Sequence, residues 1–462
     1  MRLDNHRPGF DRREMLRRAG LGLGSLALTS LLLEDGLLCA GDGQPVKKKP
    51  GTATSVIFLF MGGGPSQVDT FDPKPELTRL HGQDVPSSIA QDIPRIARAR
   101  LTNLYASPFK FIRQGKSGIP VSELFPQVGR RVDSLCILRS CKHDTPIHAP
   151  AEYISTTGTQ VGDRPSLGSW LLYGLGSVSR DLPGFVVLIA GETGRPVAWS
   201  SGFLPPRYQG TVVKKEGIPN LARPRGLTPQ QQRAQLDLID DLNRRHLEKH
   251  AGLSELDARI RSYELAFRMQ TAAAEAFDIS RETRRTQEMY GLDQADTAEF
   301  GTHCLLARRL VERGVRFVQL RHGGWDAHGN LVKNHVPQAH KTDRPIAALL
   351  DDLQQRGLLD RTLIIWGGEF GRTPAAENPG PNPGRDHSPS GYSMWLAGGG
   401  VKGGKVIGAT DPVGYAAIER PIHPNDLHAT ILHALGIDQD DLWYVHAGRK
   451  EKLTVNGGTV VR

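Results

Sequence analysis

The chain has 462 residues, of which 38% are hydrophobic, and it carries a formal net charge of +9 at pH 7. This length suits one large α/β domain with insertions, or two or three smaller domains. No apolar run reaches roughly 18 residues, so we expect no membrane span in the mature chain. The charge is spread without a basic block between aromatic residues, which argues against nucleic acid and leaves acidic polysaccharide or phosphate-bearing partners open.

The N-terminal segment differs from the rest of the chain. Arginine pairs at 12–13 and 17–18 precede a mildly apolar stretch rich in Gly, Ala and Leu that ends at Leu33. This pattern is typical of a twin-arginine export signal; the alternative is an amphipathic helix. We therefore expect residues 1–40 to be a signal peptide that the twin-arginine machinery reads. The mature protein would then be periplasmic or otherwise extracytoplasmic, and exported in folded form.

A linker and one large domain are expected after this signal. Residues 41–53 are rich in Gly, Lys, Pro and Thr, which is typical of a linker, and residues 54–462 would form the α/β domain. Cys136, Cys141 and Cys304 are an odd number of thiols in the mature chain. An odd number argues against a disulfide framework, so we expect buried free thiols.

Short, continuously apolar runs predict the strands of this domain, because strands of parallel sheets are buried on both faces. Amphipathic helical patterns at 300–314 and 345–360 alternate with these runs. Strands and helices in alternation predict a mostly parallel central sheet with helices on both faces. The predicted strands lie at 55–60, near 135, and at 185–189, 315–320, 362–366 and 392–397.

One long polar segment interrupts the alternation. Residues 228–277 shift to Gln, Arg, Glu, Ala and Leu with helical spacing and almost no breaks, which predicts a helical hairpin inserted into the α/β domain. A coiled-coil partner site is the alternative, although the heptads are few. Residues 377–384, ENPGPNPG, are typical of a surface loop.

Polar and glycine-rich stretches follow four of the predicted strands. Met61 leads into GGGPSQVDTF, Arg139 into SCKHDTPIH, Leu320 into RHGGWDAH, and Trp366 into GGEFGRT. In an open parallel sheet, the crevice beyond the carboxyl ends of the strands holds the ligand. We therefore expect Gly, His, Asp and Glu side chains from distant segments to meet at one edge.

Four of these side chains are candidate metal ligands. Asp326 and His328 are two residues apart in an extended stretch, so both can approach one cation. Alternatively, Asp326 caps the next segment and His328 is a hydrogen-bonded loop residue. Glu369 and His387 stand beside glycine-rich or turn-forming backbone. Carboxylate oxygens together with imidazole nitrogens favour zinc or manganese over a calcium cage.

Three further residues belong to the same candidate site. Arg372 has a planar guanidinium that fits a phosphate or sulfate ester, although an ordinary carboxylate partner explains it equally well. Gly63 permits close backbone approach, either to bind an anion or to make a tight turn, because GGGPSQ matches neither a P-loop nor a dinucleotide motif. Asp386 is a neighbour of His387 whose role stays open.

From about residue 53 to the end, the chain resembles a large bacterial family of exported proteins with a domain of unknown function. That family is related to the sulfatases and the alkaline phosphatase superfamily. The resemblance implies a sulfatase-like α/β fold that binds one or two divalent metal ions. The matching stretches are MGGGPSQVDTFDPKP, GGWDAHGN, GGEFGRTP, GRDHSPSGYSMWLAGGGVKGG and HPNDLHATILHALGID.

The resemblance also assigns roles to individual residues. Asp326 and His328 resemble the Asp and nearby His of the superfamily's metal site. Glu369 stands where the Asp of an Asp-His pair is expected, and His387 resembles the later His. The first strand departs from the pattern, because it ends without an acid. Either Asp69 or Asp72 would have to substitute.

The nucleophile position departs from the superfamily as well. Counting back ten residues from Gly158 places His148 where a Ser, Thr or modified Cys is expected. His148 could be a nucleophile through its imidazole, a metal ligand or general acid, or a structural residue. Thr145 and His143 in the same loop are further candidates.

These residues leave three functions open. The first is an exported metallohydrolase of phosphate or sulfate esters, with sulfated or phosphorylated glycans as a possible substrate class. The second is a non-catalytic metal- or glycan-binding relative, which the missing acid and hydroxyl favour. The third is an envelope scaffold that acts through the helical hairpin.

Overall fold

The structure is a computed structural model, and the predicted signal at residues 1–40 lies outside the residues it describes. The same holds for most of the expected linker. The described residues are 49–462 except 92, 95–100, 192–194, 215–217, 219–225 and 250–253.

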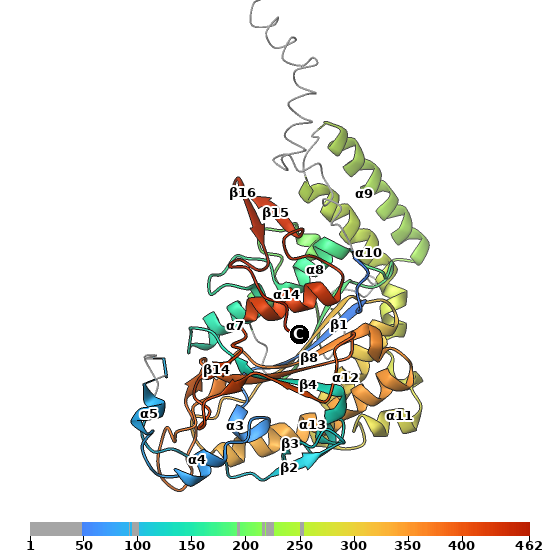
Figure 1. Cartoon of the computed structure of the whole chain (residues 1–462). Helices are drawn as coiled ribbons and strands as arrows, with labels where there is room; N and C mark the ends of the chain where they lie inside the picture. Colours follow the sequence, from blue (N-terminus) through green and yellow to red (C-terminus); the bar gives the residue numbers. More distant parts are fainter. Residues whose placement is uncertain are drawn as a thin grey trace, which may run out of the picture.

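An eight-stranded sheet forms the core of the described chain (Figure 1). In spatial order its strands are β12 (Lys405–Ile407), β4 (Leu135–Cys141), β11 (Tyr392–Ala397), β8 (Thr362–Gly367), β1 (Ser55–Met61), β7 (Phe317–His322), β5 (Phe185–Ala190) and β6 (Thr211–Val213). Strand β11 runs antiparallel to β4 and β8, and every other neighbouring pair is parallel. The mostly parallel sheet predicted from the apolar runs is therefore confirmed.

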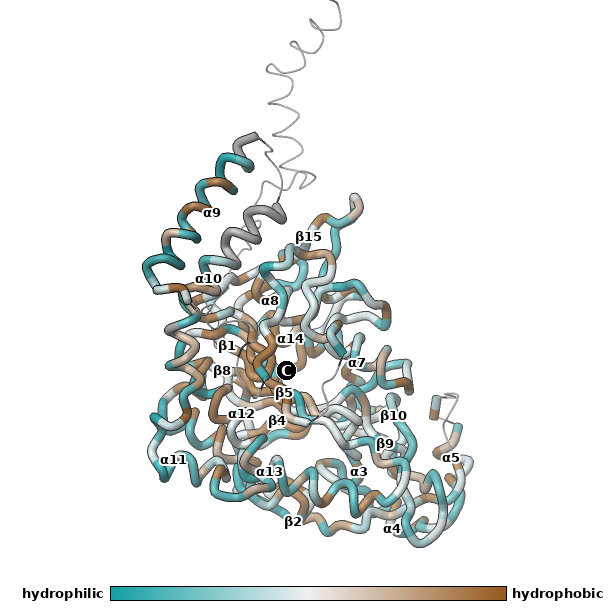
Figure 2. Tube along the Cα trace, turned by 180° about the vertical axis from the view of Figure 1, so that it is seen from behind, coloured by the Kyte–Doolittle hydropathy of each residue, from teal (hydrophilic) through white to brown (hydrophobic). Residues whose placement is uncertain are grey.

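Helices cover both faces of this sheet. Helices α12 (Ala295–Glu312) and α13 (Leu331–Gln355) pack on one face, and α8 (Leu167–Leu175) and α14 (Pro424–Ala434) pack on the other. Successive side chains of a strand point to opposite faces, so β1 supplies both cores. Figure 2 shows the strands of this core as the most hydrophobic part of the trace.

Two long helices form the segment expected as a hairpin. Helices α9 (Pro229–Lys249) and α10 (Ser254–Phe277) pack on each other and extend away from the sheet (Figures 1 and 2). Helix α9 is mostly hydrophilic, whereas the C-terminal part of α10 contributes Met269, Ala273 and Ala276 to the core. The hairpin is thus anchored through one end of α10.

Shorter elements complete the described fold. They are α3 (Gln67–Thr70), α4 (Pro75–Arg79), α5 (Ser87–Ala90), α6 (Pro126–Gly129), α7 (His148–Thr157), α11 (Arg284–Met289), and the strand pairs β2–β3 (Phe111–Gln114, Ile119–Ser122), β9–β10 (Gly371–Arg372, His387–Ser388), β13–β14 (Ala409–Thr410, Ala417–Glu419) and β15–β16 (Trp443–His446, Arg449–Lys452). Strand pair β9–β10 joins two segments of the candidate site.

Helix α13 begins earlier than the sequence indicated. The pattern at 345–360 placed Pro345 at the start of a helix, where proline is favoured. The helix instead begins at Leu331 and runs through Pro337 and Pro345. Packing against α12 over its length offsets the hydrogen bonds that the two prolines remove, so the predicted start is wrong by more than three turns.

The three thiols are buried and free, as predicted. Cys136 and Cys141 lie on β4, and Cys304 lies on α12. Burial raises the pKa of each thiol above its ordinary value. All three therefore stay protonated and unreactive at neutral pH.

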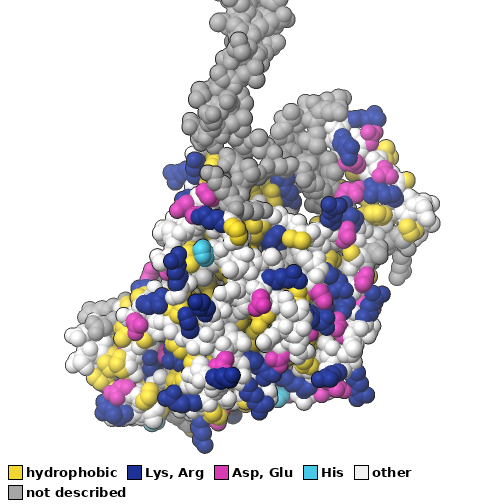
Figure 3. Space-filling view, turned by 45° about the vertical axis from the view of Figure 1, so that its right-hand side comes forward, with side chains coloured by type: hydrophobic (Ala, Val, Ile, Leu, Met, Phe, Trp, Pro, Cys, Tyr) yellow, Lys and Arg dark blue, Asp and Glu magenta, His cyan; other side chains and the backbone are white. Residues whose placement is uncertain are grey.

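The surface shows no large region of one charge on the face drawn in Figure 3. Lys and Arg side chains are scattered over that face and interspersed with Asp and Glu. Within the part of the chain that the structure describes, no helix has the length and apolar character needed to cross a membrane.

Candidate metal centre

Five strands place the candidate residues at one edge of the sheet. The parallel strands β1, β4, β7 and β8 all end there, and the antiparallel strand β11 begins there. His148 opens helix α7 after β4, Asp326 follows β7, and Glu369 follows β8. His387, on β10, precedes β11. The antiparallel direction of β11 is what allows a residue before a strand to join residues that follow strands.

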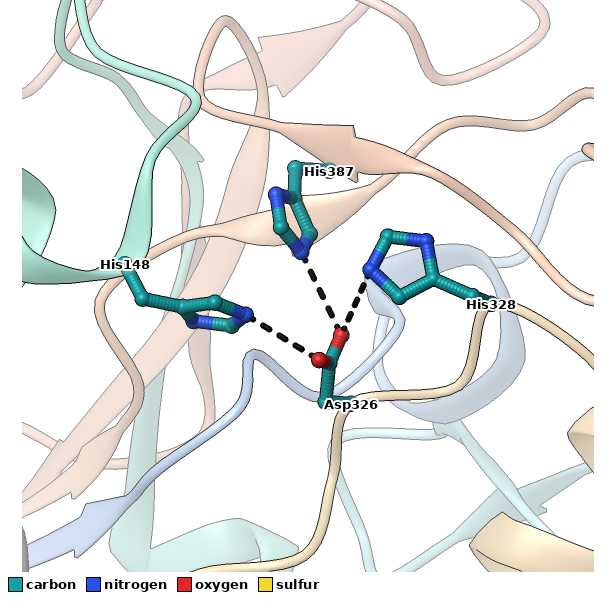
Figure 4. A group of neighbouring side chains, drawn as sticks. All are labelled: His148, Asp326, His328 and His387. Atoms are coloured by element: carbon teal, nitrogen blue, oxygen red, sulfur yellow. Dashed lines mark hydrogen bonds and ion pairs between the residues drawn. The ribbon is translucent and has the colours of Figure 1, made fainter.

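Asp326 lies at the centre of three imidazoles (Figure 4). The Nε2 atoms of His328 and His387 lie 3.0 Å and 3.2 Å from its Oδ1, and His148 Nε2 lies 3.2 Å from its Oδ2. One ligand atom from each of these four residues lies within 4.8 Å of the other three. The structure therefore brings together Asp326, His328 and His387 as expected for ligands, with His148 as the fourth member.

The Nδ1 atom of each imidazole forms a hydrogen bond with an oxygen atom. These contacts are His387 Nδ1 to the Pro146 carbonyl at 2.6 Å, His148 Nδ1 to Glu369 Oε1 at 2.7 Å, and His328 Nδ1 to Glu377 Oε2 at 2.5 Å. A carbonyl or ionised carboxylate can only accept, so each Nδ1 carries the proton and donates. In a neutral ring the lone pair then lies on Nε2, which is the arrangement that metal-binding histidines show.

The centre is strongly charged in the absence of a bound cation. Burial alone would raise the pKa of Asp326, but His148, His387 and Arg372 hold it far below its usual range. Burial alone would lower the pKa of His148, but hydrogen bonds to Asp326 and Glu369 outweigh it and raise that pKa to about 9. His148 is thus protonated at neutral pH, and its positively charged ring lies between the carboxylates of Asp326 and Glu369.

The donor set fits a divalent metal. Three imidazole nitrogens and one carboxylate oxygen are a ligand set that suits zinc, and also manganese. His148 Nε2 is buried, and its printed contact is the 3.2 Å ion pair with Asp326 Oδ2. His387 Nε2 would present a lone pair to an acceptor in its neutral form. A cation held within the four-residue group would satisfy these two nitrogen atoms together.

Glu369 contacts the centre through His148. Its Oε1 accepts hydrogen bonds from the His148 ring and from the Gly63 N–H at 2.9 Å, so it orients His148. It is not a member of the four-residue cluster, whose fourth member is His148. The assignment of Glu369 as a metal ligand stays a prediction.

Arg372 lies beside Asp326 inside the protein. Its side chain is fully buried, and its guanidinium donates to the carbonyls of Gly63, Gly64 and Arg385 and to Asp326 Oδ1. These donors are used inside the protein, and a contact of Arg372 with an anionic ester stays a prediction. Its contact with Asp326, at 2.5 Å, positions that carboxylate.

Neither of the two substitute acids reaches the centre. Asp69 is fully buried and pairs with Arg385 at 2.7 Å. Asp72 accepts a hydrogen bond from Thr410 at 2.5 Å and lies 3.2 Å from Lys74. Both carboxylates are used by partners outside the four-residue group, and the substitution of either for the first-strand acid stays a prediction.

Gly63 and Asp386 act through the backbone. Gly63 has a φ of +105°, and a Cβ there would lie 2.5 Å from the Asp326 nitrogen, so glycine is required by close approach. Asp386 accepts a hydrogen bond from the N–H of His387 at 2.8 Å. It also forms a second group of potential ligand atoms with His328 and Glu377.

The two other loop candidates are structural in this geometry. His143 is buried, its Nε2 contacts the Glu369 carbonyl at 2.5 Å, and its Nδ1 accepts from the Thr145 N–H. Burial lowers the pKa of His143 to about 4, so it is neutral. Neither residue lines the cavity beside the centre.

An open cavity of about 840 Å³ lies beside the centre. His148, Asp326 and Glu369 line it together with the cationic residues Arg195 and Arg321. Within the described chain its wall contains no Ser, Thr or Cys side chain. The described part of the wall therefore offers carboxylate, imidazole and guanidinium groups, and no hydroxyl or thiol nucleophile among them.

Four residues that were not among the predicted site residues also shape this site: Glu152, Arg195, Arg321 and Glu377. Glu152 pairs with Arg321 at 2.5 Å, and its carboxylate accepts a hydrogen bond from the Arg195 N–H. Glu152 follows His148 by one helical turn, so the i, i+4 spacing on α7 could have indicated it. Glu377 lies in the predicted surface loop at 377–384, where no spacing relates it to His328.

Removal of the Asp69 charge should cost stability rather than metal. Asp69→Asn leaves Arg385 buried without its partner, which we expect to lower the free energy of unfolding by about 3 to 5 kcal/mol. Urea denaturation measures this, and Asp360→Asn, at an exposed position, is the control with a change within about 0.5 kcal/mol. Metal loss from folded Asp69→Asn protein, with stability unchanged, would contradict the structural role.

Metal affinity should rise with pH. The pKa of His148 is about 9 in the metal-free protein, so below that pH a cation must displace a proton from this ring. One displaced proton gives about tenfold tighter zinc binding per pH unit. Competition with a chromophoric chelator at pH 6.5, 7.5 and 8.5 measures it. His433→Gln, on the exposed side of α14, should behave as wild type, and a pH-independent affinity would exclude His148 as a ligand.

Known structures give a distant likeness. The match to the lipoteichoic acid synthase LtaP from Listeria monocytogenes has 9% identity and a TM-score of 0.37, and covers 86% of this chain and 77% of that one. The match to the alkaline phosphatase of the Antarctic bacterium TAB5 has 10% identity and a TM-score of 0.36, and it covers 85% of this chain and 100% of that one. The match to the phosphonate monoester hydrolase SpPMH from Silicibacter pomeroyi has 10% identity and a TM-score of 0.35, and it covers 83% of this chain and 74% of that one.

The sequence itself matches a family. No curated protein matches the chain. A family model described as a protein of unknown function, DUF1501, matches residues 53–462, which is the whole α/β domain with all of the candidate ligands. The chain therefore belongs to the DUF1501 family.

Proposed function

We propose that this protein is an exported metal-dependent hydrolase of phosphate or sulfate esters, with sulfated or phosphorylated glycans as one substrate class. The observation that carries the proposal is the convergence of three imidazole Nε2 atoms on Asp326 beside an open cavity. Each ring has its other nitrogen fixed by an oxygen, which is an arrangement suited to holding a cation rather than to packing.

The residues that would hold zinc or manganese are His148, Asp326, His328 and His387. A divalent cation bound there would act as a Lewis acid on the ester. His148 Nδ1 is held by Glu369, and its Nε2 faces Asp326 within the four-residue group, so we assign His148 as a ligand rather than as a nucleophile. Glu369 keeps its ring in place.

The chain's own residues supply the remaining functions of a hydrolytic site. Arg195 and Arg321 both pair with Glu152, at 3.8 Å and 2.5 Å. Arg321 is buried, whereas Arg195 is exposed at the cavity, where its remaining donors can hold an ester anion. Glu369 Oε2, without a partner among the described residues, can accept a hydrogen bond from a water molecule in the cavity. Because no hydroxyl or thiol lines the described wall, we propose direct attack by water without a covalent intermediate.

A second candidate is a metal- or glycan-binding protein without turnover. The cavity wall described above has no hydroxyl nucleophile, and Arg372 is used internally. Both observations favour a site that binds without reacting. The two candidates share the metal ligands and differ only in catalysis.

Loss of the central carboxylate should abolish both metal content and hydrolysis. Asp326→Ala removes the oxygen atoms that the three imidazoles face, so we expect no bound metal and hydrolysis of 4-nitrophenyl phosphate or sulfate reduced at least about a hundredfold. Elemental analysis and a chromogenic assay measure these, with Asp360→Ala as the control. A metal-free, active Asp326→Ala protein would overturn the proposal, and a metal-loaded wild type inactive on every ester would leave the binding role.

Export rests on the sequence of residues 1–40, which lie outside the described residues. Replacing the arginine pairs at 12–13 and 17–18 by lysine pairs keeps the charge and removes the twin-arginine pattern. We expect a protein fused to residues 1–50 to accumulate in the cytoplasm after this change and in the periplasm without it. Cell fractionation measures the distribution. Equal export of both fusions would contradict a twin-arginine signal.

A further inference from the structure

A second cavity lies at the opposite edge of the sheet from the metal centre. It has a volume of about 770 Å³ and lies where β5 and β6 begin, between the end of α8 and helix α10. Phe185 at the start of β5 lines it, whereas Gly191, just after β5, lines the cavity of the metal centre. At the strand rise per residue, the two positions are about 20 Å apart, so the cavities are separate. We call it the hairpin cavity, because Leu265 and Arg268 of α10 form one wall.

The inner part of the hairpin cavity is apolar. Leu172 of α8, Phe185 of β5 and Leu182 between these two elements line it and are largely buried, and Leu265 adds an apolar side chain from α10. Pockets of this volume with apolar walls bind organic molecules rather than free ions. An occupant therefore has an apolar body.

The outer part of the same cavity carries positive charge. Arg180, Arg207 and Arg268 line it, with Asp181 as the acidic member of the lining. The guanidinium of Arg180 makes no hydrogen bond or ion pair with any residue that the structure describes. Arg268 donates through Nε to the Arg180 carbonyl at 3.0 Å, and it lies 3.7 Å from Asp181 and 3.9 Å from Glu264, which are long ion pairs at an exposed side chain. The lining thus has an excess of guanidinium groups.

Two of these arginines are already held in place. The Arg207 guanidinium lies over the ring of Tyr208, 4.9 Å from its centroid. The hydrogen bond from Arg268 Nε to the Arg180 carbonyl fixes the position of the Arg268 guanidinium. Preplaced guanidinium groups lose less conformational entropy when they bind a carboxylate or phosphate, and their planar donors suit both anions.

We propose that the hairpin cavity binds an amphipathic anion, a molecule with an aliphatic or aromatic body and one carboxylate or phosphate group. The apolar body contacts Leu172, Leu182, Phe185 and Leu265, and the anionic group contacts Arg180 and Arg268. This site does not depend on the proposed hydrolase activity. It gives the helical hairpin a function, because α10 contributes both an apolar and a cationic group to the wall.

Decanoate and decyl phosphate are suitable probes, tested below their aggregation concentrations by isothermal titration calorimetry on the full mature chain. We expect saturable binding of both anions, and at least about tenfold weaker binding of decyltrimethylammonium. A preference for decanoate over decyl phosphate identifies a carboxylate ligand, and the reverse identifies a phosphate ligand. Equal affinity for the cationic analogue, or no saturable binding of either anion, would overturn the proposal.

A matched pair of double variants tests the arginines. Arg180→Gln with Arg268→Gln should weaken decanoate binding at least about tenfold, because both charge-assisted contacts are lost. Arg284→Gln with Arg285→Gln changes the net charge equally at exposed positions on α11 and should bind as wild type. Equal affinities of the two double variants would refute the assignment.

A separate substitution tests the apolar wall. Leu265→Asp places a carboxylate where the apolar body is expected and should also weaken binding at least about tenfold. Circular dichroism confirms that each variant is folded, and the arginine pair provides the test on its own if Leu265→Asp is unstable. Full affinity in folded Leu265→Asp protein would exclude this wall as the binding surface.

Discussion

The direction of the strands is the constraint on which the site depends. Parallel strands β1, β4, β7 and β8 end at one edge, so residues more than 200 positions apart in the chain, such as His148 and His387, meet there. The exception, β11, runs the other way and brings His387 to the same edge from the opposite side. A fully parallel sheet with the same sequence order would place that histidine at the far end.

Local hydrogen bonds convert this proximity into a site. The three rings around Asp326 are fixed by Pro146, Glu369 and Glu377, which come from three different loops. Arg372 donates to the Asp326 carboxylate and fixes its orientation. The three rings need little rearrangement when a cation binds, because these contacts already direct the Nε2 atoms toward a common point. The same contacts explain the burial of so many charged groups, each of which has a partner of opposite sign or an acceptor.

The sequence predicted the elements and the edge better than the individual roles. Continuous apolar runs identify buried strands, and the order of strands and helices fixes which ends meet, so Asp326, His328 and His387 could be placed together before any coordinates. Which of Glu369 and His148 belongs to the four-residue group could not be predicted, because a ligand and the group that orients it differ only by the direction of a side chain. Arg372, Asp69 and Asp72 are buried and contact partners inside the protein. The sequence could not indicate this, because a buried polar residue after a strand leaves no periodic pattern. The early start of α13 was missed for a related reason: its packing against α12 overrides two prolines.

The buried thiols bear on the durability of the molecule outside a reducing environment. Cys136, Cys141 and Cys304 lie within the sheet and α12, with their pKa values raised by burial. Oxidation and crosslinking both require a thiolate that reagents can reach. If the chain is exported already folded, as we propose, these sulfur atoms cross the membrane inside its packed interior, where an oxidising compartment leaves them unchanged. A chain that crossed unfolded would expose all three during refolding, with mispaired bridges as the hazard.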